Sequence, residues 1–403
     1  YWNHRGEKLI DASAGLFCAA AGHCRKEIAE AVYKQLQTLD FSPHFQVAHP
    51  NSFELARRVA QLTPGDLDYV FFANSGSEAV DTAMKIALAY HRAKGEGQRI
   101  RFVSRERAYH GVNFGGTSLS GMVRNRETFA GAMIPNVAHM RHTWLPEGKF
   151  VKGQPEAGVE LADDLQRLAD LHGPGTIAAC FVEPIAGSTG VLVPPKGYLE
   201  RLRQICDRHG ILLVFDEVIC GFGRTGRPFA AQSFGVTPDM ITMAKALTNG
   251  AQPMGAVAAS AKIYETVTEA APEQAIELFH GYTYSAHPAA CAAGIATLDI
   301  YEREGLFEKA AALSPYFLDA VFSLSDLPII TDIRGYGLIA GFDMAPMDGK
   351  PGRRGYDATK RLFNAGMHIK FTGDSGIVAP PFIAGKQHVD EIVGTLRNVL
   401  SQY

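Results

Sequence analysis

Hydrophobic residues follow two different spacings along the middle of this chain, and the two spacings alternate. Uninterrupted apolar runs are typical of parallel strands buried on both faces, whereas a repeat of three to four residues is typical of an amphipathic helix. The apolar runs that predict strands lie at residues 69–72, 100–103 and 177–182, and in the segments that begin at 211 and 239. The helical repeats lie between them, at 76–93, 159–171 and 198–209. This alternation predicts a mainly parallel sheet with helices on both faces.

The spacing changes towards the C-terminus. Residues 254–260 could add a strand to the sheet, and the alanine-rich stretch at 286–301 predicts a helix that bridges to a second unit. The segments beyond it mix helices and strands, which predicts a smaller α+β domain. Its expected helices are 306–322, 356–365 and a C-terminal helix with apolar residues at 389, 392, 393, 396 and 400, and its expected strands are 329–333 and 337–342. We therefore expect a large α/β domain at 41–298 and a small domain formed by 1–40 and 299–403.

The composition excludes several classes of protein. The chain has 403 residues, of which 46% are hydrophobic and 20% charged, as in an ordinary globular protein. Its net charge of −3 gives no reason to expect nucleic acid or an anionic membrane surface as a partner. No apolar run approaches the roughly 20 residues of a membrane helix. The first residues lack an initiator methionine and show no signal-peptide pattern.

The spacing of cysteine and histidine argues against a metal centre. The cysteines show no CxxC or zinc-type spacing, and the 14 histidines include no HExxH. Several cysteines lie in apolar segments, where a free thiol behaves as a small hydrophobic residue. Free thiols persist in reducing compartments, so we expect a cytoplasmic protein without a metal site. The six cysteines are Cys18, Cys24, Cys180, Cys206, Cys220 and Cys291.

Two of the predicted strands end in residues that bear on catalysis. Asp216 and Glu217 follow the strand at 211, and Lys245 follows the strand at 239. Ligands of open α/β sheets bind where the carboxyl ends of strands meet, so Asp216 and Lys245 should emerge there. An acid that keeps a heterocyclic nitrogen protonated and a lysine that forms an imine are what a pyridoxal phosphate (PLP) enzyme requires. Strands that end in Asp-Glu also occur in ATPases, and lysines at helix starts are usually only solvated, so these residues alone leave the alternatives open.

The segment after the strand at 69 is suited to an anion. Ser75 and Glu78 match the S-x-x-E pattern of a capping box, which alone explains a well-capped helix. Small residues such as Gly76 also leave backbone N–H groups open at a helix start, where a phosphate binds favourably. Ser77 could add a hydroxyl donor. Both interpretations stay open at this point.

Two other nucleotide-binding interpretations fit less well. Residues 221–226 match G-x-G-x-x-G, but residues 216–220 separate them from the strand and Pro228 blocks an immediate helix. A loop near the site is expected there, which disfavours a nicotinamide oxidoreductase. The chain contains no G-K-S or G-K-T to build the phosphate loop of an ATPase.

Aromatic residues follow two further segments. Tyr109, which follows the strand at 100, could lay its ring on a ligand, although a tyrosine packed between domains is an equal alternative. Residues 279–288 are dense in hydroxyl and aromatic groups, which suits either a ligand or a subunit contact.

Together the segments resemble the class III aminotransferases, PLP enzymes of fold type I, over essentially the whole chain. Segments 15–18, 21–24 and 107–114 are most similar to the ω-amino acid:pyruvate (β-alanine:pyruvate) subgroup. The resemblance implies a mainly parallel seven-stranded sheet, a smaller α+β domain and a homodimer with active sites at the subunit interface, and it leaves a tetramer open. The matching landmarks are residues 74–78, 109–111, 182–184, 216–218, 221–226, 244–245 and 281–284.

The resemblance also implies roles for individual residues. Lys245 would form the Schiff base with PLP and shuttle a proton between substrate and cofactor, and Asp216 would keep the ring nitrogen protonated. Tyr109 and Val218 would sandwich the ring, and Glu183 would bind near its edge. The other expected cofactor contacts are Ser75, Gly76, Ser77, His110, Tyr282 and Thr283, with Gly76 and Ser77 binding the phosphate from one subunit and Thr283 from the other.

Three positions depart from the pattern of the subgroup. Phe17 stands where relatives often have tryptophan, which would alter a wall of the substrate pocket, and Ala286 replaces a usual glycine. Lys370 stands where relatives have an arginine that binds the substrate carboxylate. Lysine keeps the charge but lacks the two-pronged geometry, so we expect weaker keto acid binding. A solvated lysine at a strand end is the alternative.

The expected reaction is a ping-pong transfer of an amino group from an ω-amino acid or amine to pyruvate, with PLP as cofactor. A taurine or polyamine aminotransferase, or an aminomutase or decarboxylase on the same scaffold, is the alternative within PLP chemistry. The amino donor itself is not given by the sequence.

Overall fold

A seven-stranded sheet forms the centre of the molecule in the computed structural model, which describes residues 1–45 and 47–403. In spatial order the sheet is β2-β8-β7-β6-β5-β3-β4. Only β8 runs antiparallel to its neighbours, so the prediction of a mainly parallel sheet is confirmed. Its strands are β2 (Tyr69–Ala73), β3 (Arg101–Arg105), β4 (Val137–Met140), β5 (Ile177–Val182), β6 (Leu212–Asp216), β7 (Met240–Met243) and β8 (Gly255–Ala259).

One strand of this sheet has no counterpart in the sequence prediction. The edge strand β4 reads Val-Ala-His-Met, which is too short and too polar to show an uninterrupted apolar run. It pairs in parallel with β3, and only its last residue, Met140, is buried. An edge strand has one paired side and an open one, so it needs less apolar surface than a central strand.

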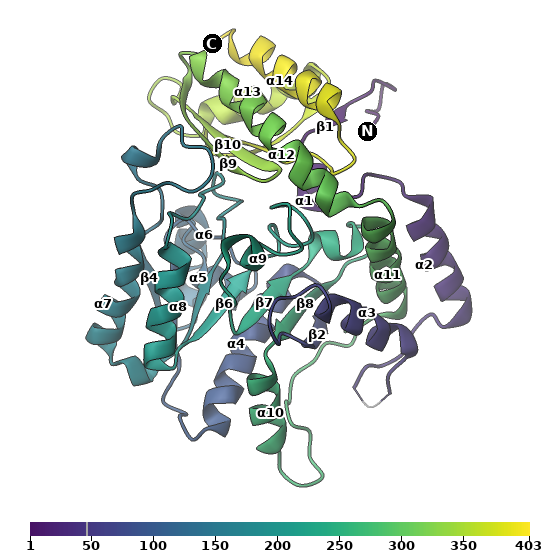
Figure 1. Ribbon diagram of the computed structural model, residues 1–403, viewed down its shortest axis with the longest axis vertical. Helices are drawn as coiled ribbons and strands as arrows, with labels where there is room; N and C mark the ends of the chain where they lie inside the picture. Colours follow the sequence, from purple (N-terminus) through teal and green to yellow (C-terminus); the bar gives the residue numbers. More distant parts are fainter. Residues whose placement is uncertain (46) are drawn as a thin grey trace.

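Helices cover both faces of the sheet, as expected (Figure 1). On β5 the side chains alternate: Cys180 and Val182 pack on the side of α7 and α8, whereas Ala179 and Phe181 pack on the side of α4. This alternation is the two-residue period of a strand buried on both faces. The helices of this part are α3 (Pro50–Ala60), α4 (Gly76–Ala93), α5 (Phe114–Leu119), α6 (Val123–Thr128), α7 (Asp163–His172), α8 (Tyr198–His209), α9 (Ala230–Phe234), α10 (Ala261–Glu269) and α11 (Pro288–Arg303).

A second, antiparallel sheet with the strand order β12-β13-β10-β9 lies in the C-terminal part. The turn between β9 and β10 contains Gly337 at φ 60°, where a Cβ would lie 2.4 Å from the Arg224 carbonyl oxygen, so glycine is required there. Figure 1 shows this sheet and its helices gathered at one end of the molecule. The elements are α12 (Leu306–Phe322), β9 (Ile330–Tyr336), β10 (Ile339–Met344), α13 (Arg353–Asn364), β11 (Met367–His368), β12 (Lys370–Thr372), β13 (Ser375–Val378) and α14 (Lys386–Leu400).

The N-terminal residues contact both parts. Strand β1 (Ile10–Asp11) pairs in parallel with β11, and the short α1 (Ala14–Phe17) follows it. Helix α2 (Lys26–Thr38) packs against α11. The pairing of β1 is consistent with the expected small domain, and the division at 41–298 stays a prediction. Within the described residues, no helix is long and apolar enough to cross a bilayer.

Candidate active site

Residues from five separate segments meet at the carboxyl edge of the seven-stranded sheet. They enclose a cavity of about 130 Å³, with Asp216 and Lys245 on its wall as the strand ends predict. The cavity is lined by Gly76, Ser77, Tyr109, His110, Gly111, Glu183, Asp216, Val218, Ile219, Ala244 and Lys245. The parallel strands β5, β6 and β7 all end at this edge, which explains why residues so far apart in the sequence come together.

The N-terminus of α4 supplies one side of the cavity. Ser75 is its N-cap residue, and the Ser75 hydroxyl accepts a hydrogen bond from the Glu78 N–H at 3.2 Å. Only this half of the expected capping box forms. In the other half Glu78 should accept from the Ser75 N–H, but its carboxylate accepts from the N–H of Asn74 at 2.7 Å. The first N–H groups of a helix have no acceptor within the helix, so they are available to an anion in the cavity.

Gly76 and Ser77 bring this helix start close to its neighbours. A Cβ on Gly76 would lie 3.0 Å from the Val218 side chain, so a larger residue would crowd the turn. The Ser77 hydroxyl accepts the N–H of Val112 at 3.0 Å and keeps its own proton free to donate. The arrangement suits a phosphate, with backbone N–H groups and one hydroxyl as donors.

Asp216 is held by a buried chain of hydrogen bonds. Its Oδ2 lies 2.8 Å from His110 Nδ1, and His110 Nε2 lies 3.0 Å from the Ser104 hydroxyl. Because a carboxylate only accepts, Nδ1 carries a proton, and Nε2 of a neutral ring then accepts from Ser104. The Asp216 Oδ1 accepts the N–H of Val218 at 3.2 Å. The carboxylate is therefore fixed at the cavity wall.

The same three residue types form the catalytic triad of hydrolases, but here the chain cannot act in that way. Ser104 is completely buried, whereas Asp216 reaches the cavity. The end of the chain that meets a ligand is thus the carboxylate and not a nucleophilic hydroxyl. A carboxylate in this position suits a cationic ring nitrogen.

Glu183 fixes the backbone of Tyr109. Its Oε1 accepts the Tyr109 N–H at 3.0 Å, and the guanidinium of the buried Arg105 donates to the Glu183 carbonyl oxygen. Burial raises the pKa of the Glu183 carboxyl to about 7, against the opposing effect of His110. Tyr109 lines the cavity next to these groups, and its predicted position on the face of a ligand stays a prediction.

Lys245 is poised as a nucleophile. Burial lowers the pKa of its amine below that of a free lysine, against the opposing effect of the neighbouring Cys18 and Asp216. A larger fraction of the amine is then neutral, as attack on a carbonyl requires. Lys245 has φ 47°, in the left-handed region that residues with side chains rarely adopt, and such strain clusters at active sites.

The other predicted site residues lie outside the cavity lining. The Phe17 ring centre is 5.7 Å from Lys245 Nζ, so Phe17 is adjacent to the site. Tyr282 donates from its hydroxyl to the Glu78 carbonyl oxygen at 3.3 Å, and Thr283 beside it is exposed. Lys370 lies half-buried on β12 of the other sheet. Its hairpin is tied to the loop after β5 through Thr372. The roles predicted for all these residues stay predictions.

Sequence reasoning did not identify Ser104 or Arg105. Both belong to β3, where two polar residues follow the apolar Phe102 and Val103. Buried polar residues at a strand end are a signal that could have identified them, since they need partners.

The glycine-rich segment 221–226 forms a loop, as expected, and one of its residues has a structural role. The buried Arg224 donates to the carbonyl oxygens of Leu338 at 3.1 Å and Pro380 at 2.7 Å, so it joins the large sheet to the C-terminal part. No long helix follows the glycines, and the dinucleotide interpretation is wrong on these grounds.

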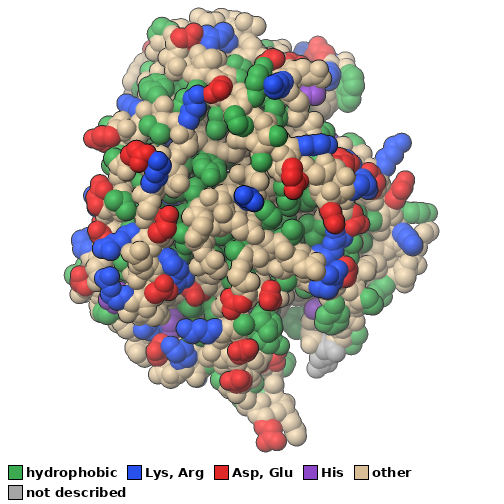
Figure 2. All heavy atoms as spheres, in the orientation of Figure 1, with side chains coloured by type: hydrophobic (Ala, Val, Ile, Leu, Met, Phe, Trp, Pro, Cys, Tyr) green, Lys and Arg blue, Asp and Glu red, His purple; other side chains and the backbone are tan. Residues whose placement is uncertain are grey.

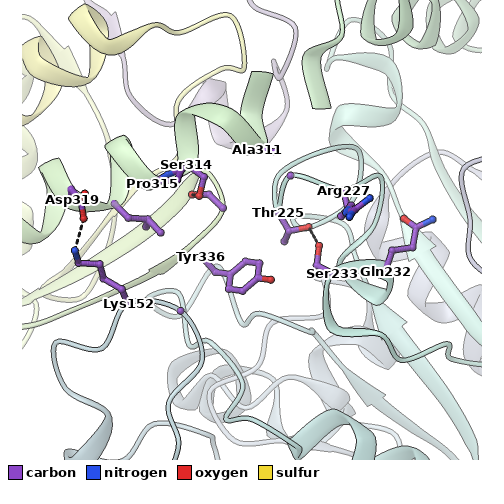
Figure 3. Close-up of a pocket in the computed structure, with 14 residues that line it drawn as sticks. Lys152, Thr225, Arg227, Gln232, Ser233, Ala311, Ser314, Pro315, Asp319 and Tyr336 are labelled. Atoms are coloured by element: carbon purple, nitrogen blue, oxygen red, sulfur yellow. Dashed lines mark hydrogen bonds and ion pairs between the residues drawn. The ribbon is translucent and has the colours of Figure 1, made fainter. Parts of the chain in front are cut away.

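A wider hollow of about 650 Å³ lies between α12 and the segment from Thr225 to Ser233 (Figure 3). Four of its polar side chains are paired with one another: the Thr225 and Ser233 hydroxyls are 2.7 Å apart, and Lys152 pairs with Asp319. It shares no lining residue with the Lys245 cavity. The smaller cavity therefore remains the candidate active site.

The fold and the site together define a class of enzyme, and comparison with known proteins agrees. A family model described as aminotransferase class-III matches residues 1–400, and the chain belongs to this family. The predicted family and the predicted transaminase activity are thereby confirmed.

Individual relatives are similar over nearly their whole length. The chain is 54% identical to an omega-aminotransferase of Caulobacter vibrioides over 100% of this chain and 91% of that protein. It is 49% identical to the omega-amino acid–pyruvate aminotransferase of Pseudomonas putida over 99% and 89%. The solved structure of the omega transaminase from Pseudomonas jessenii in complex with PMP superposes with a TM-score of 0.93 at 34% identity, over 100% of this chain and 90% of that one. The predicted fold type is confirmed by this similarity.

Proposed function

We propose that this protein transfers an amino group from an ω-amino acid or a related amine, of the β-alanine type, to pyruvate, with PLP bound at Lys245. The observation that carries the proposal is the single cavity shared by Lys245, Asp216 and the N-terminus of α4. The names of the relatives from Caulobacter vibrioides and Pseudomonas putida support the reaction. PLP supplies an electron sink, which stabilises negative charge on the carbon that bears the amino group.

The residues of the cavity fit this cofactor group by group. The first N–H groups of α4 and the Ser77 hydroxyl would bind the phosphate, and Asp216 would pair with the protonated ring nitrogen. Tyr109 and Val218 would lie on the two faces of the ring, with Glu183 at its edge. The Lys245 amine would be covalently joined to the cofactor and, when released, would carry the proton between carbons.

We propose that His110 acts through Asp216 and not by contact with the cofactor. Its two ring nitrogens are already engaged, one with Asp216 and one with Ser104. This changes the role expected from the sequence, in which His110 was a direct cofactor contact.

The substrate would approach from the side of Phe17 and Lys370. Phe17 lies against Lys245, so it would form a wall of the substrate pocket. We propose that Lys370 receives the carboxylate of pyruvate, less rigidly than an arginine would.

A second copy of this chain is the proposed partner. A groove of about 860 Å³ lies beside β2 and α10, and its lining includes the exposed aromatic residues Phe45, Phe53, Tyr264 and Phe279. The groove borders the segment that carries Thr283, which lies outside the cavity of its own chain. A dimer would cover this apolar surface and bring Thr283 to the phosphate site of the partner. Sedimentation of a monomer at micromolar concentration would contradict this part.

We propose neither nucleic acid nor a membrane surface as a further partner. Acidic and basic side chains are interspersed over the face shown in Figure 2, and the net charge is −3. All six cysteines are free thiols, which supports the proposed cytoplasmic location.

Two measurements on the purified protein test the function. Borohydride reduction should fix the cofactor on the peptide that contains Lys245, with Lys245→Ala as the control that retains none. A panel of donors, including β-alanine, taurine, putrescine and arylalkylamines, should then be incubated with pyruvate. Stoichiometric formation of alanine identifies the donor, whereas product formation without transfer of nitrogen to pyruvate would indicate an aminomutase or decarboxylase.

A further inference from the structure

The segment that carries Thr283 is fastened to the helix whose N-terminus faces the cavity. The His280 ring stacks on the Phe71 ring, with centres 5.4 Å apart and planes 8° from parallel. His280 Nε2 lies 2.8 Å from the Thr82 hydroxyl, and Lys85 Nζ lies 3.3 Å from Nδ1. Thr82 and Lys85 belong to α4, so one histidine joins this segment to both β2 and α4.

The protons of this contact can be assigned. An ammonium group only donates, so Nδ1 of His280 accepts from Lys85 and the ring proton lies on Nε2, which donates to the Thr82 hydroxyl. Burial lowers the pKa of His280 to about 4, so the ring is neutral near pH 7, as this assignment requires. Thr82 itself is completely buried.

A second residue fastens the segment nearer to the cavity. The Tyr282 hydroxyl donates to the Glu78 carbonyl oxygen in the first turn of α4, and the Tyr282 ring meets the edge of the His280 ring at 5.1 Å. The Tyr282 N–H donates to the Ser285 hydroxyl at 3.2 Å, and the Ser285 N–H donates back to the Tyr282 carbonyl oxygen at 3.0 Å. These bonds close a turn that displays Thr283 and Tyr284 on the surface.

We propose that His280 is a positioning residue that fixes Thr283 on α4, so that one helix holds the cofactor phosphate of its own subunit through its N-terminus and that of the partner through Thr283. The inference rests on the proposed function, in which Thr283 acts across a dimer. Because Thr283 of one subunit would bind the phosphate of the other, a change at His280 in one subunit affects cofactor retention in the other.

Single variants test the contact first. His280→Ala removes the stack and the hydrogen bond to Thr82. Thr82→Val, with little change of shape, removes the hydrogen bonds of the Thr82 hydroxyl to His280 at 2.8 Å and to Tyr282 at 3.4 Å. Each variant should speed PLP release from the holoenzyme by about 5-fold or more, as expected when at least one buried hydrogen bond is lost. Tyr282→Phe, which removes the Tyr282 hydroxyl alone, should have a smaller effect than Thr82→Val. His44→Ala is the matched control, since His44 lines the same groove but bonds to Ser52 instead of α4. Release is followed by cofactor fluorescence after dilution, and sedimentation checks that each variant is still dimeric.

Mixed dimers show in which subunit His280 acts. One subunit carries Lys245→Ala, so borohydride can trap PLP only on the Lys245 of the other. When His280→Ala is placed in the Lys245→Ala subunit, trapping on the intact Lys245 should fall to the level of the doubly changed His280→Ala dimer. When His280→Ala is placed in the subunit with the intact Lys245, trapping should match the wild type.

The outcomes separate the inference from the function it rests on. If Thr283→Ala speeds PLP release but His280→Ala and Thr82→Val do not, or if His280→Ala acts only within its own subunit, the inference is overturned and the proposed function stands. If Thr283→Ala leaves release unchanged, the contact across the dimer is itself wrong. Should His280→Ala dissociate the dimer, the comparison of Thr82→Val with Tyr282→Phe decides, and equal rates of PLP release in these two variants would overturn the role of His280.

Discussion

The wall of the Lys245 cavity and the β12–β13 hairpin that carries Lys370 hold their polar groups in opposite ways. At the cavity, Asp216 is 5% exposed and both of its oxygens accept hydrogen bonds from fixed donors. On the hairpin, Lys370 is half-buried, and its ammonium forms no ion pair with any residue of 1–45 or 47–403. The hairpin itself is fixed by Thr372, which donates to the Ser188 carbonyl oxygen at 2.7 Å.

This difference matches the two roles proposed for these regions, cofactor binding at the cavity and substrate binding on the hairpin. Groups that set the chemistry of a bound cofactor act best when they are preorganised, because they then need no rearrangement as charge develops. A residue that must accept both a keto acid and a donor of different charge needs freedom to move. The comparison predicts large, position-dependent losses for changes at the cavity and small changes in KM for the hairpin.

Lys245→Ala should give the largest effect. It would remove both the proposed covalent attachment and the proposed proton carrier, so kcat for alanine formation should fall by about 10⁴-fold. Initial rates at saturating donor and pyruvate measure this loss. Lys262→Ala, at an exposed position on α10, is the control and should keep full activity. Activity of Lys245→Ala within 10-fold of the wild type would rule out the proposed attachment site.

Asp216→Asn should follow, with a loss of about 10²–10³-fold in kcat, which is typical when one preorganised charged partner is removed. The amide oxygen can still accept from His110, so shape and hydrogen bonding are largely kept and the charge alone is lost. Asp299→Asn, on the exposed side of α11, is the matched control. An equal loss in both variants would show that the effect is not specific to the cavity.

The strand ends explain how much of this region could be predicted from the sequence. Asp216 and Lys245 follow apolar runs directly, and parallel strands bring such positions together whatever their separation in the chain. The partners of Asp216 could not be predicted in the same way. Whether Ser104 reaches His110 depends on the spacing and register of side chains around β3, which a one-dimensional pattern does not contain.

The fold shows the same limit. Buried central strands can be predicted from their apolar composition, whereas the edge strand β4 cannot. The reversed direction of β8 depends on the connection that precedes it and not on its residues. From its residues alone the exposed turn at Thr283 is only rich in hydroxyl and aromatic groups, and the phosphate role predicted for Thr283 came from the family resemblance. Its attachment to α4 through His280 depends on a tertiary contact between residues about 200 positions apart.

Glu183→Gln tests the cavity wall through the pH dependence of protein stability. The folded-state pKa of Glu183 is raised from 4.5 to about 7 by burial, so the stability that its protonated form contributes is complete below pH 4.5 and is lost as the pH rises through 7. A shift of this size corresponds to about 3 kcal/mol. The uncharged glutamine can still accept a hydrogen bond from the Tyr109 N–H. Because it does not titrate, it loses no stability as the pH rises through 7.

The melting temperature of the apoprotein, measured between about pH 5 and pH 8, should therefore fall less in Glu183→Gln than in the wild type. Glu391→Gln on α14 provides the control, because Glu391 is exposed and forms no ion pair with any of the described residues. Parallel curves for Glu183→Gln and the wild type would mean that Glu183 is not protonated in the folded state.

His110→Phe tests whether a residue that acts through Asp216 matters less than Asp216 itself. Loss of one hydrogen bond to a buried carboxylate should lower kcat by about 10-fold. Ser104→Ala, which is one hydrogen bond further from the cavity than His110, should lower kcat by about 2- to 3-fold. If Asp216 is the point of action, His110→Phe should also alter the pH dependence of cofactor absorbance, and the double variant Asp216→Asn/His110→Phe should be no worse than Asp216→Asn. Additive losses would assign His110 an independent role.

Lys370 should give the smallest effect, and one confined to a single substrate. An ion pair between a half-exposed lysine and a carboxylate is worth up to about 1 kcal/mol, so Lys370→Ala should raise the KM for pyruvate by about 5-fold at most and leave kcat nearly unchanged. Lys370→Arg should lower the same KM by a few-fold, because the guanidinium can bind both carboxylate oxygens at once. An arylalkylamine donor, which has no carboxylate, should keep its KM in both variants. If the KM for pyruvate does not change in either variant, Lys370 has no part in recognition, and a group closer to Phe17 must receive the carboxylate.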